Sequence, residues 1–303
     1  MEKLDFLIIG AGPSGMYFAK KCQEFKKKYK LIEKKKVIGG QPMALYPDKI
    51  VYDYPNTKEI ISRQIIKKLR KGIKQIYINQ SVKKIVFKNG KFDVFLTKEQ
   101  KILADKIVIA TGLGSFSFNP LMIKEAKGKE NIIYSVKNVR MFRNKSVIVL
   151  GGGDSAVDWA NQLTKIAAAV TLVHRREELR ASQSDISLLK KNNVELLLNW
   201  TPDRLIVNDT LSIRNNLTGS LRQIPYDYII VQYGFKIEGA IPSFLRGIKV
   251  TSNNKIIVDK NQQTNITNIF AIGDCCFYDN KENTMASGIN EADKILSKNI
   301  SKK

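Results

Sequence analysis

The sequence contains few of the residues that build disulfide-linked or zinc-stabilised proteins. Its 303 residues include three cysteines and one histidine. Three cysteines cannot make a disulfide framework, and no CxxC pair or Cys/His cluster offers a metal site. Cys275 and Cys276 are adjacent, and a bond between neighbouring cysteines is strained. We therefore expect two reduced, packed thiols and no bound metal.

Long hydrophobic runs are also absent. No stretch reaches the roughly 18 apolar residues that a membrane-spanning helix needs. Met1–Leu4 leads directly into a predicted strand, which leaves no room for a signal peptide. We therefore expect a cytoplasmic protein with no membrane partner.

Acidic residues are scarce relative to basic ones. The chain has 28 Asp and Glu against 51 Lys and Arg, a formal net charge of +23. Such a charge is compatible with nucleic-acid binding. The lysines are scattered, however, and runs such as Lys26–Lys28 and Lys34–Lys36 are typical of solvated turns, so general compositional bias explains most of the charge. A nucleic-acid-binding protein is the less favoured alternative, and the remaining charge suits an acidic protein partner.

One pattern, a strand followed by a glycine turn and a helix, occurs twice. In each copy a β-branched strand runs into GxGxxG or GxGxxA, which is the context that gives this motif its meaning. The first glycine allows a tight turn, the second lets backbone N–H groups approach a pyrophosphate, and the third position keeps helix and strand close. The first copy contains Gly10, Gly12, Pro13, Ser14 and Gly15. The second contains Gly151, Gly153, Asp154, Ser155 and Ala156.

The end of the second strand in each copy indicates which nucleotide binds there. Glu33 lies 18 residues after the last glycine of the first turn, and His174 lies 18 residues after Ala156. A carboxylate accepts hydrogen bonds from a free ribose diol, whereas the guanidinium pair Arg175-Arg176 suits a 2′-phosphate. The first copy is therefore predicted to hold FAD or NAD, and the second NADP(H).

The length suggests two domains of ordinary size. We predict an α/β fold of two nested Rossmann-like, three-layer dinucleotide-binding domains. Residues 1–114 and 237–303 form the first, and residues 115–236 form an NADP(H)-binding domain inserted into it. Expected elements include a helix over 58–71, strands over 75–82, 82–87, 91–96 and 106–110, a linker over 114–120, a meander over 203–222 and a last helix over 284–296.

Longer motifs carry a family resemblance. The chain resembles the pyridine nucleotide–disulfide oxidoreductase superfamily over nearly its whole length. Within it, the sequence is most similar to the thioredoxin-reductase-like ferredoxin (flavodoxin)–NADP⁺ reductase group. The segments that carry this likeness are Gly39–Gln41, Ala44–Pro47, Gly151–Ala160 and His174–Arg176.

The sequence departs from thioredoxin reductases at one decisive place. Those enzymes have a CxxC dithiol shortly before the second glycine motif. Here that position holds Tyr134-Ser135-Val136-Lys137. Without a thiolate no dithiol relay can form, so thioredoxin reduction is not expected.

The resemblance implies roles for individual residues in binding FAD. Gly10–Gly15 would hold the pyrophosphate and Glu33 the adenosine ribose, unless Glu33 is simply a surface carboxylate. Tyr46 would stack on the isoalloxazine ring, or else contribute ordinary aromatic packing, and Asp274 would accept a ribityl hydrogen bond, a role compatible with helix capping. The remaining FAD residues implied are Gln41, Val82 (through its backbone), Thr111, Gly112, Phe116, Gly273 and Thr284.

The NADP(H) site and the mechanism follow from the same resemblance. The site would use Gly151, Gly153, Asp154, Ser155, Ala156, His174, Arg175, Arg176 and Arg180, with His174 equally compatible with a surface position. No side-chain acid, base or nucleophile is required, because the cofactors supply the chemistry.

Electrons from NADPH would pass through FAD to a small acidic ferredoxin or flavodoxin, and a homodimer is expected. An NADPH oxidase or diaphorase that uses quinone or oxygen is the alternative. Members of the group usually continue past the last helix into a segment that covers the flavin. Because this chain stops at Lys303, we expect a more exposed flavin face and a weaker case for the dimer.

Overall fold

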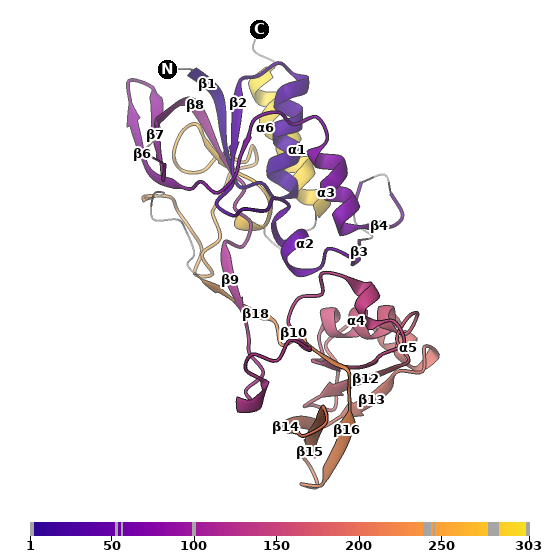
Figure 1. The fold of residues 1–303 in the computed structure, drawn as a ribbon. Helices are drawn as coiled ribbons and strands as arrows, with labels where there is room; N and C mark the ends of the chain where they lie inside the picture. Colours follow the sequence, from indigo (N-terminus) through magenta and orange to yellow (C-terminus); the bar gives the residue numbers. More distant parts are fainter. Residues whose placement is uncertain are drawn as a thin grey trace. The chain divides into compact units, whose positions relative to one another are not determined.

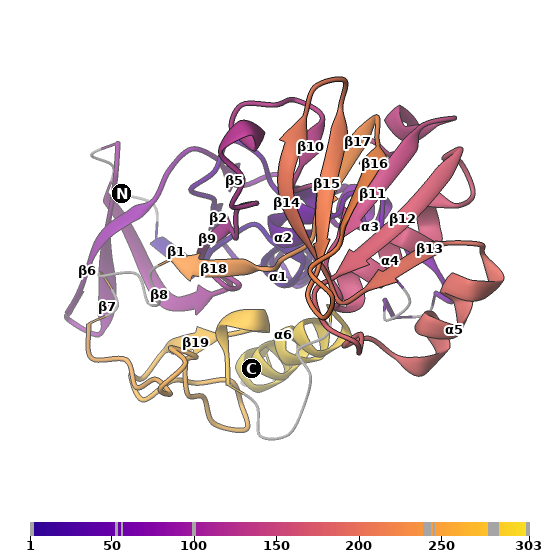
Figure 2. The same ribbon diagram turned by 90° about the horizontal axis from the view of Figure 1, so that it is seen from below.

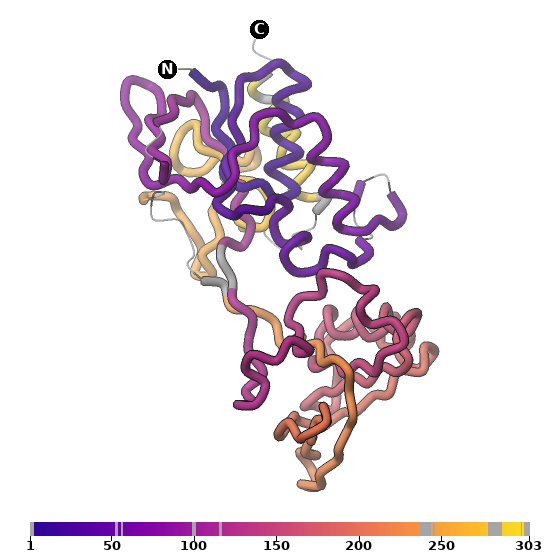
Figure 3. Tube along the Cα trace, viewed as in Figure 1, coloured from indigo at the N-terminus to yellow at the C-terminus, as the bar shows by residue number. Residues whose placement is uncertain are grey.

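The computed structural model describes residues 3–51, 54–55, 57–98, 101–238, 244, 246–277 and 285–300. The chain divides into two compact units. Unit 1 comprises Met1–Phe116 and Ile237–Lys303, and unit 2 comprises Ser117–Lys236. In Figure 3, unit 1 accordingly carries both the indigo and the yellow ends of the colour scale.

Unit 1 is built on a seven-stranded, mostly parallel sheet in the order β5-β2-β1-β8-β7-β6, with β19 also paired to β8. Its strands are β1 (Lys3–Ile9), β2 (Tyr29–Ile32), β5 (Ile76–Tyr77), β6 (Val82–Lys88), β7 (Lys91–Leu96), β8 (Lys101–Ile109) and β19 (Ile269–Ala271). A separate antiparallel pair joins β3 (Ile50–Val51) to β4 (Ile60–Ile61). The helices are α1 (Pro13–Glu24), α2 (Gly40–Leu45), α3 (Ser62–Arg70) and α6 (Met285–Ile300), with a short 3₁₀ turn, η4, at Gly273–Cys275.

The central strand β1 shows why this sheet is covered on both faces. Phe6 and Ile8 pack against one cluster, formed with helices α1, α3 and α6, which lie together on one face of the sheet (Figure 1). Leu4, Leu7 and Ile9 pack against a second cluster on the opposite face. A strand segment buried on both faces must be apolar at every position, and β1 is apolar without a break from Phe6 to Ile9.

Unit 2 has a five-stranded parallel sheet in the order β10-β17-β11-β12-β13. The strands are β10 (Ile132–Ile133), β11 (Ser146–Leu150), β12 (Ala169–His174), β13 (Glu195–Leu198) and β17 (Tyr228–Val231). Its helices are α4 (Asp154–Leu163) and α5 (Gln183–Lys191), with 3₁₀ turns η1 (Lys124–Ala126) and η2 (Val139–Phe142). An antiparallel meander of β14 (Trp200–Ile206), β15 (Thr210–Asn215) and β16 (Leu221–Pro225) completes the unit (Figure 2).

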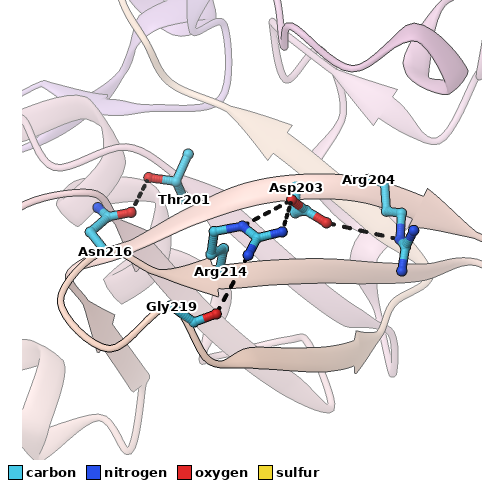
Figure 4. A network of polar contacts seen from close by, with 6 residues as sticks. All are labelled: Thr201, Asp203, Arg204, Arg214, Asn216 and Gly219. Atoms are coloured by element: carbon cyan, nitrogen blue, oxygen red, sulfur yellow. Dashed lines mark hydrogen bonds and ion pairs between the residues drawn. The ribbon is translucent and has the colours of Figure 1, made fainter.

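The meander packs on the parallel sheet through an apolar core. Leu205, Leu211 and Ile213 of the meander share one cluster with Ile148 and Leu150 of β11. Its exposed side chains are joined by polar contacts (Figure 4). Arg214 donates to Asp203 at 3.0 Å, and Thr201 donates to Asn216 at 2.9 Å. Exposed ion pairs contribute little to stability, so the apolar core holds the meander in place.

The fold confirms the predicted α/β class with parallel sheets. The strand predicted over 75–82 is limited to Ile76–Tyr77 (β5), and two further local predictions were wrong because of strand pairing. The predicted linker over 114–120 contains strand β9 (Ser115–Phe118), which pairs with β18 (Phe235–Glu238) where the chain returns to unit 1. The predicted helix over 58–71 begins only at Ser62, because β4 pairs with β3 before it. Both differences arise from strand pairing between distant segments, which local patterns do not reveal.

Asp227 links the starts of two unit 2 strands. It accepts the Ser146 N–H at 2.8 Å and the Lys145 ammonium at 3.1 Å. The pKa of the Asp227 carboxyl is lowered, mainly by the hydrogen bond from the Ser146 N–H and next by the one from Lys145. A carboxylate with a depressed pKa stabilises the fold above its usual pKa, and that stabilisation is lost as the pH falls through the folded-state value.

We predict that Asp227→Asn lowers the free energy of unfolding of unit 2 by about 1 kcal/mol near neutral pH, because a charged acceptor is lost. The difference should shrink as the pH falls below about 4. Both tryptophans, Trp159 and Trp200, lie in unit 2, so tryptophan fluorescence during urea unfolding follows this unit. Asp209→Asn, which breaks an exposed pair with Lys129 in the same unit, is the control and should have little effect. A difference that persists unchanged into acid would contradict the assignment.

Candidate functional site

The first glycine turn joins β1 to α1 in a very close packing of backbones. Gly10 has φ +108°, and a Cβ there would overlap the carbonyl of Ala110 at the end of β8. A Cβ at Gly15 would overlap the carbonyl of Gly10. At Gly12 the nearest heavy atom to an added Cβ, among the described residues beyond its chain neighbours, is the Gly40 Cα at 4.0 Å. The turn is therefore packed tightly against the backbone at Gly10 and Gly15 and is open at Gly12. This geometry fits a pyrophosphate at the α1 N-terminus.

Glu33 reaches this turn from the end of β2. One carboxylate oxygen accepts the Ala11 N–H at 2.8 Å, and the other accepts the Lys35 N–H at 2.8 Å. The side chain is half-buried. Each carboxylate oxygen has a second lone pair, so both can still accept hydrogen bonds from a ribose diol.

Four further predicted residues, from three segments that lie far apart in the sequence, come together. Gln41, at the start of α2, donates to the Asp274 carboxylate at 2.9 Å. A Cβ at Gly112, just after β8, would lie 3.6 Å from the same Gln41 amide nitrogen. Gly273 begins the 3₁₀ turn η4 and has φ +74°. These polar groups converge within unit 1, at the ends of parallel strands where ligands bind in such sheets.

Ser14 lies at the same junction. An added Cβ at Gly273 would come within 2.7 Å of the Ser14 hydroxyl, and one at Gly288 of α6 would overlap it. The hydroxyl therefore packs against two glycines rather than standing free. The missing side chains at Gly273 and Gly288 let α1 and α6 approach closely.

The remaining predicted residues of unit 1 have more varied surroundings. Tyr46 follows α2, and the Lys49 ammonium lies 5.9 Å from its ring centroid. Val82 is buried at the start of β6, and Thr111 is half-buried after β8. Phe116 is part of the β9 backbone, but its side chain lies outside the described structure, as does Thr284.

The adjacent cysteines are buried beside the Asp274 turn as free thiols. Their sulfur atoms lie 3.9 Å apart, and the Cys275 thiol donates to the Ile272 carbonyl at 3.2 Å. Their state agrees with the expected reduced thiols.

The second glycine turn joins β11 to α4 in the same way. Gly151 has φ +149°, and an added Cβ would lie 2.6 Å from the Gln232 carbonyl. Around Gly153 no heavy atom of the described residues lies within 4 Å of an added Cβ. Asp154 and Ser155 are exposed at the start of α4, and Ala156 is buried against the strand. This turn is again open where a pyrophosphate would bind.

His174 packs beneath this turn instead of pointing away from the protein. A Cβ at Gly152 would overlap its ring, and the buried Nε2 has no hydrogen-bond partner among the described residues. Burial lowers the pKa of His174, and the nearby arginines lower it further. A lowered pKa favours the neutral imidazole.

The arginines lie on the loop that follows β12. Arg175, Arg176 and Arg180 are exposed. The backbone N–H of Arg180 donates to the Gly152 carbonyl at 2.6 Å, which fixes the loop beside the glycine turn. Three guanidinium groups are thus displayed along one loop, an arrangement suited to an anionic group.

Two asparagines that the sequence analysis missed hold this loop. The Asn216 side-chain amide donates to the Arg175 carbonyl at 2.7 Å, and the Asn199 N–H donates to the Arg176 carbonyl at 3.2 Å. Asn199 has φ +63°. Asparagine is common at such turn positions. The asparagines in the sequence therefore indicated turns, but they did not indicate which loop those turns contact.

Together these features define a class. Two Rossmann-type parallel sheets, each with a glycine turn leading into a helix, are typical of proteins that bind two dinucleotides. The model of the pyridine nucleotide-disulphide oxidoreductase family matches residues 4–293, and the chain belongs to this family. The predicted resemblance and the assignment as an oxidoreductase are confirmed.

Curated relatives extend over almost the whole chain. A ferredoxin–NADP reductase of Malacoplasma penetrans is 37% identical, with 96% of this chain and 94% of the relative covered. One from Streptococcus pneumoniae serotype 19F is 35% identical, covering 95% and 91%.

Solved structures show the same fold. Lactococcus lactis thioredoxin reductase has a TM-score of 0.75 at 25% identity, with 97% of each chain covered. The thioredoxin reductase of T. acidophilum has a TM-score of 0.78 at 21% identity, covering 99% of this chain and all of its own. Within the described residues, no helix is both long enough and apolar enough to span a bilayer.

The packing of His174 under Gly152 yields a stability prediction. Gly152→Ala should lower the free energy of unfolding of unit 2 by about 1–3 kcal/mol, because the added methyl overlaps the imidazole. Urea unfolding followed by tryptophan fluorescence measures the change. In a His174→Ala background the same substitution should cost much less. Equal costs in both backgrounds would show that the ring does not limit this position.

Proposed function

We propose that this protein is an FAD-dependent reductase that passes electrons from NADPH, reversibly, to a one-electron carrier protein, a ferredoxin or a flavodoxin. The observation that carries the proposal is the pair of similar glycine turns with opposite charges beside them. Glu33 lies at the turn of unit 1, and Arg175 and Arg176 lie on the loop beside the turn of unit 2. The relatives named ferredoxin–NADP reductase support the same activity.

Unit 1 has the groups to hold FAD. The Gly10–Gly15 turn would take the pyrophosphate, Glu33 the adenosine ribose, and the Gln41–Asp274 pair the ribityl chain. Tyr46, Val82, Thr111, Gly112, Phe116 and Thr284 remain proposed contacts. Bound FAD supplies the chemistry, accepting a hydride from NADPH and releasing electrons one at a time.

The helix N-termini of unit 1 add an electrostatic contribution. Ser14 in the first turn of α1 packs against Gly288 in the first turns of α6, so the two helices begin close together. Each N-terminus carries a partial positive charge. Their combined field favours negative charge on a group bound in front of them. No side-chain acid or base is needed for this contribution.

Unit 2 would hold NADP(H). The Gly151–Ala156 turn would take the pyrophosphate, and Arg175, Arg176 and Arg180 the 2′-phosphate. We propose that His174 supports the turn from beneath rather than contacting phosphate, since its ring packs against Gly152.

The absence of the dithiol separates this chain from thioredoxin reductases. Tyr134 stands at one end of the corresponding position, and its hydroxyl accepts the Leu121 N–H at 3.1 Å. Lys137 stands at the other end, so a thiol relay has no residues to use here.

The surplus of positive charge supports an acidic carrier as the partner. Long-range attraction between opposite charges raises the association rate and weakens with added salt. We also propose a cytoplasmic location and a homodimer, on the basis of the family resemblance. Light scattering of the purified protein measures the oligomeric state.

Anaerobic spectroscopy tests the main proposal. After reconstitution with FAD the protein should be yellow, NADPH should bleach it, and added ferredoxin or flavodoxin should be reduced faster than quinone or oxygen. A protein that stays colourless, or that NADPH does not bleach, would contradict the proposal. Faster transfer to quinone or oxygen than to either carrier would instead indicate a diaphorase or oxidase.

Cofactor preference provides a sharper prediction. The double variant Arg175→Ala, Arg176→Ala should raise KM for NADPH by about 30- to 900-fold, which corresponds to roughly 2–4 kcal/mol for two lost phosphate contacts. KM for NADH should change little, because NADH has no 2′-phosphate. Steady-state kinetics with ferricyanide as acceptor gives both values.

The matched control is Lys190→Ala, Lys191→Ala. It removes two exposed positive charges from the end of α5 in the same unit and should leave both KM values nearly unchanged. Equal losses with NADPH and NADH in the arginine variant would rule out the phosphate assignment.

A further inference from the structure

Glu291 is a buried carboxylate to which the proposed reaction gives no role. It lies in α6, is only 3% exposed, and accepts the Gly273 N–H at 2.7 Å. An ionised side chain is rarely buried unless it is hydrogen-bonded, because leaving water is costly. A helix that only needed to pack could place an apolar residue here. The carboxylate therefore indicates that the Gly273 backbone N–H, which it accepts, needs an acceptor at this position.

Gly273 and Asp274 form a turn that is held from several sides. The Ile272 N–H donates to the Ile109 carbonyl of β8 at 2.9 Å, and the Cys276 N–H donates to the Gly273 carbonyl at 2.9 Å. The Asp274 carbonyl accepts the Lys255 ammonium, and its carboxylate accepts the Gln41 amide. In this turn, Glu291 supplies the acceptor for the Gly273 N–H.

The conformation of Gly273 makes this acceptor important. Its φ of +74° lies in the left-handed region, which glycine enters readily but also leaves readily. Ser14 crowds the position where a side chain would be, so a bulkier residue could not restrain the turn. A charge-assisted hydrogen bond to the backbone N–H restrains it without adding any atom at Gly273.

We propose that Glu291 is a positioning residue for FAD binding: by holding the Gly273 N–H it fixes the turn that presents the Asp274 carboxylate beside Gln41. The proposal rests on the proposed function, because it takes the Asp274 turn to be part of the FAD site. Glu291 itself contacts the backbone of the turn and acts through Asp274.

Three substitutions at Glu291 separate the effect of side-chain length from the effect of charge. Glu291→Ala removes the acceptor, Glu291→Asp keeps the charge but withdraws it by one methylene, and Glu291→Gln keeps an oxygen in place without charge. We expect FAD to bind about 10- to 100-fold more weakly to the alanine and aspartate variants, the effect of losing a hydrogen bond to a charged group. The glutamine variant should stay within about threefold of the unmodified protein. Flavin fluorescence quenching on titration into apoprotein measures the affinity.

A matched control comes from the same helix. Asp293 in α6 accepts the Tyr17 hydroxyl of α1 at about 3.1 Å. Asp293→Ala removes a carboxylate that also joins α6 to α1, but Asp293 is exposed and its hydrogen bond is to Tyr17. The variant should leave FAD affinity within about threefold of the original. If it weakens FAD as much as Glu291→Ala does, the effect is one of helix packing and the proposal fails.

Coupling to Asp274 distinguishes positioning from general stability. In an Asp274→Ala background, Glu291→Ala should weaken FAD by less than about threefold, because the carboxylate that it positions has been removed. If the losses of FAD affinity in the two single variants multiply in the double variant, the proposal is overturned. If the alanine variant does not fold, the aspartate variant provides the same comparison.

Amide exchange of the apoprotein tests the hydrogen bond without any cofactor. With ¹⁵N-labelled glycine, the Gly273 N–H should exchange slowly in the unmodified and glutamine variants and at least about tenfold faster in the aspartate variant. Equal exchange in all three would overturn the proposal. This measurement is independent of the proposed function, which fails separately if the unmodified protein does not bind FAD.

Discussion

The close approach of three backbone segments at the end of β1 is the constraint on which unit 1 depends. Gly10 meets the carbonyl of Ala110, and Gly15 meets the carbonyl of Gly10, at distances that no side chain at either glycine would permit. This contact brings the start of α1 directly onto the ends of β1 and β8. Parallel strands all end at the same edge of the sheet. The loops that follow these strands therefore lie close to the N-terminus of α1.

The Gly273–Asp274 turn extends that constraint to the other end of the chain. It follows β19, which pairs with β8, so its position along the sheet is set by strand register. Ser14 then packs against Gly273 and Gly288, and Glu291 holds the Gly273 N–H. The first and last elements of the chain thus meet around a few small residues. Substituting any of them would move two elements rather than one.

Sequence patterns predicted those parts of the molecule that depend on local chemistry. The glycine turns and the charged residues after the second strands follow from short motifs, and the strands over 82–87 and 91–96 were also predicted. What the sequence could not reveal depends on contacts between distant segments. The strand pairing of 115–118 with 235–238 and the hydrogen bond from Asn216 to Arg175 belong to this group. Glu291 was missed for the same reason, since a glutamate in an amphipathic helix is usually exposed.

His174 shows how little a local pattern says about the surroundings of a side chain. As the first residue of a His-Arg-Arg run at the expected offset, it was as compatible with phosphate contact as with a surface position. In the structure its ring packs against Gly152, and burial lowers its pKa. A residue at the end of a strand can point to either face, and its neighbour in space, a glycine that leaves room, decides which.

The two candidate nucleotide sites differ in how firmly their side chains are held, and this difference has a consequence for affinity. In unit 1, Glu33, Gln41 and Asp274 are half-buried and already hydrogen-bonded to the protein. Such groups lose little further freedom when a ligand binds. In unit 2 the guanidinium groups are exposed on a loop that is anchored through its backbone, so ordering them on binding costs roughly 0.5–1.5 kcal/mol for each side chain. A preorganised site favours tight retention, and a site that must order three arginines favours release. The arrangement therefore suits a resident FAD in unit 1 and an exchangeable NADP(H) in unit 2, as an enzyme that exchanges nicotinamide cofactor in every cycle requires.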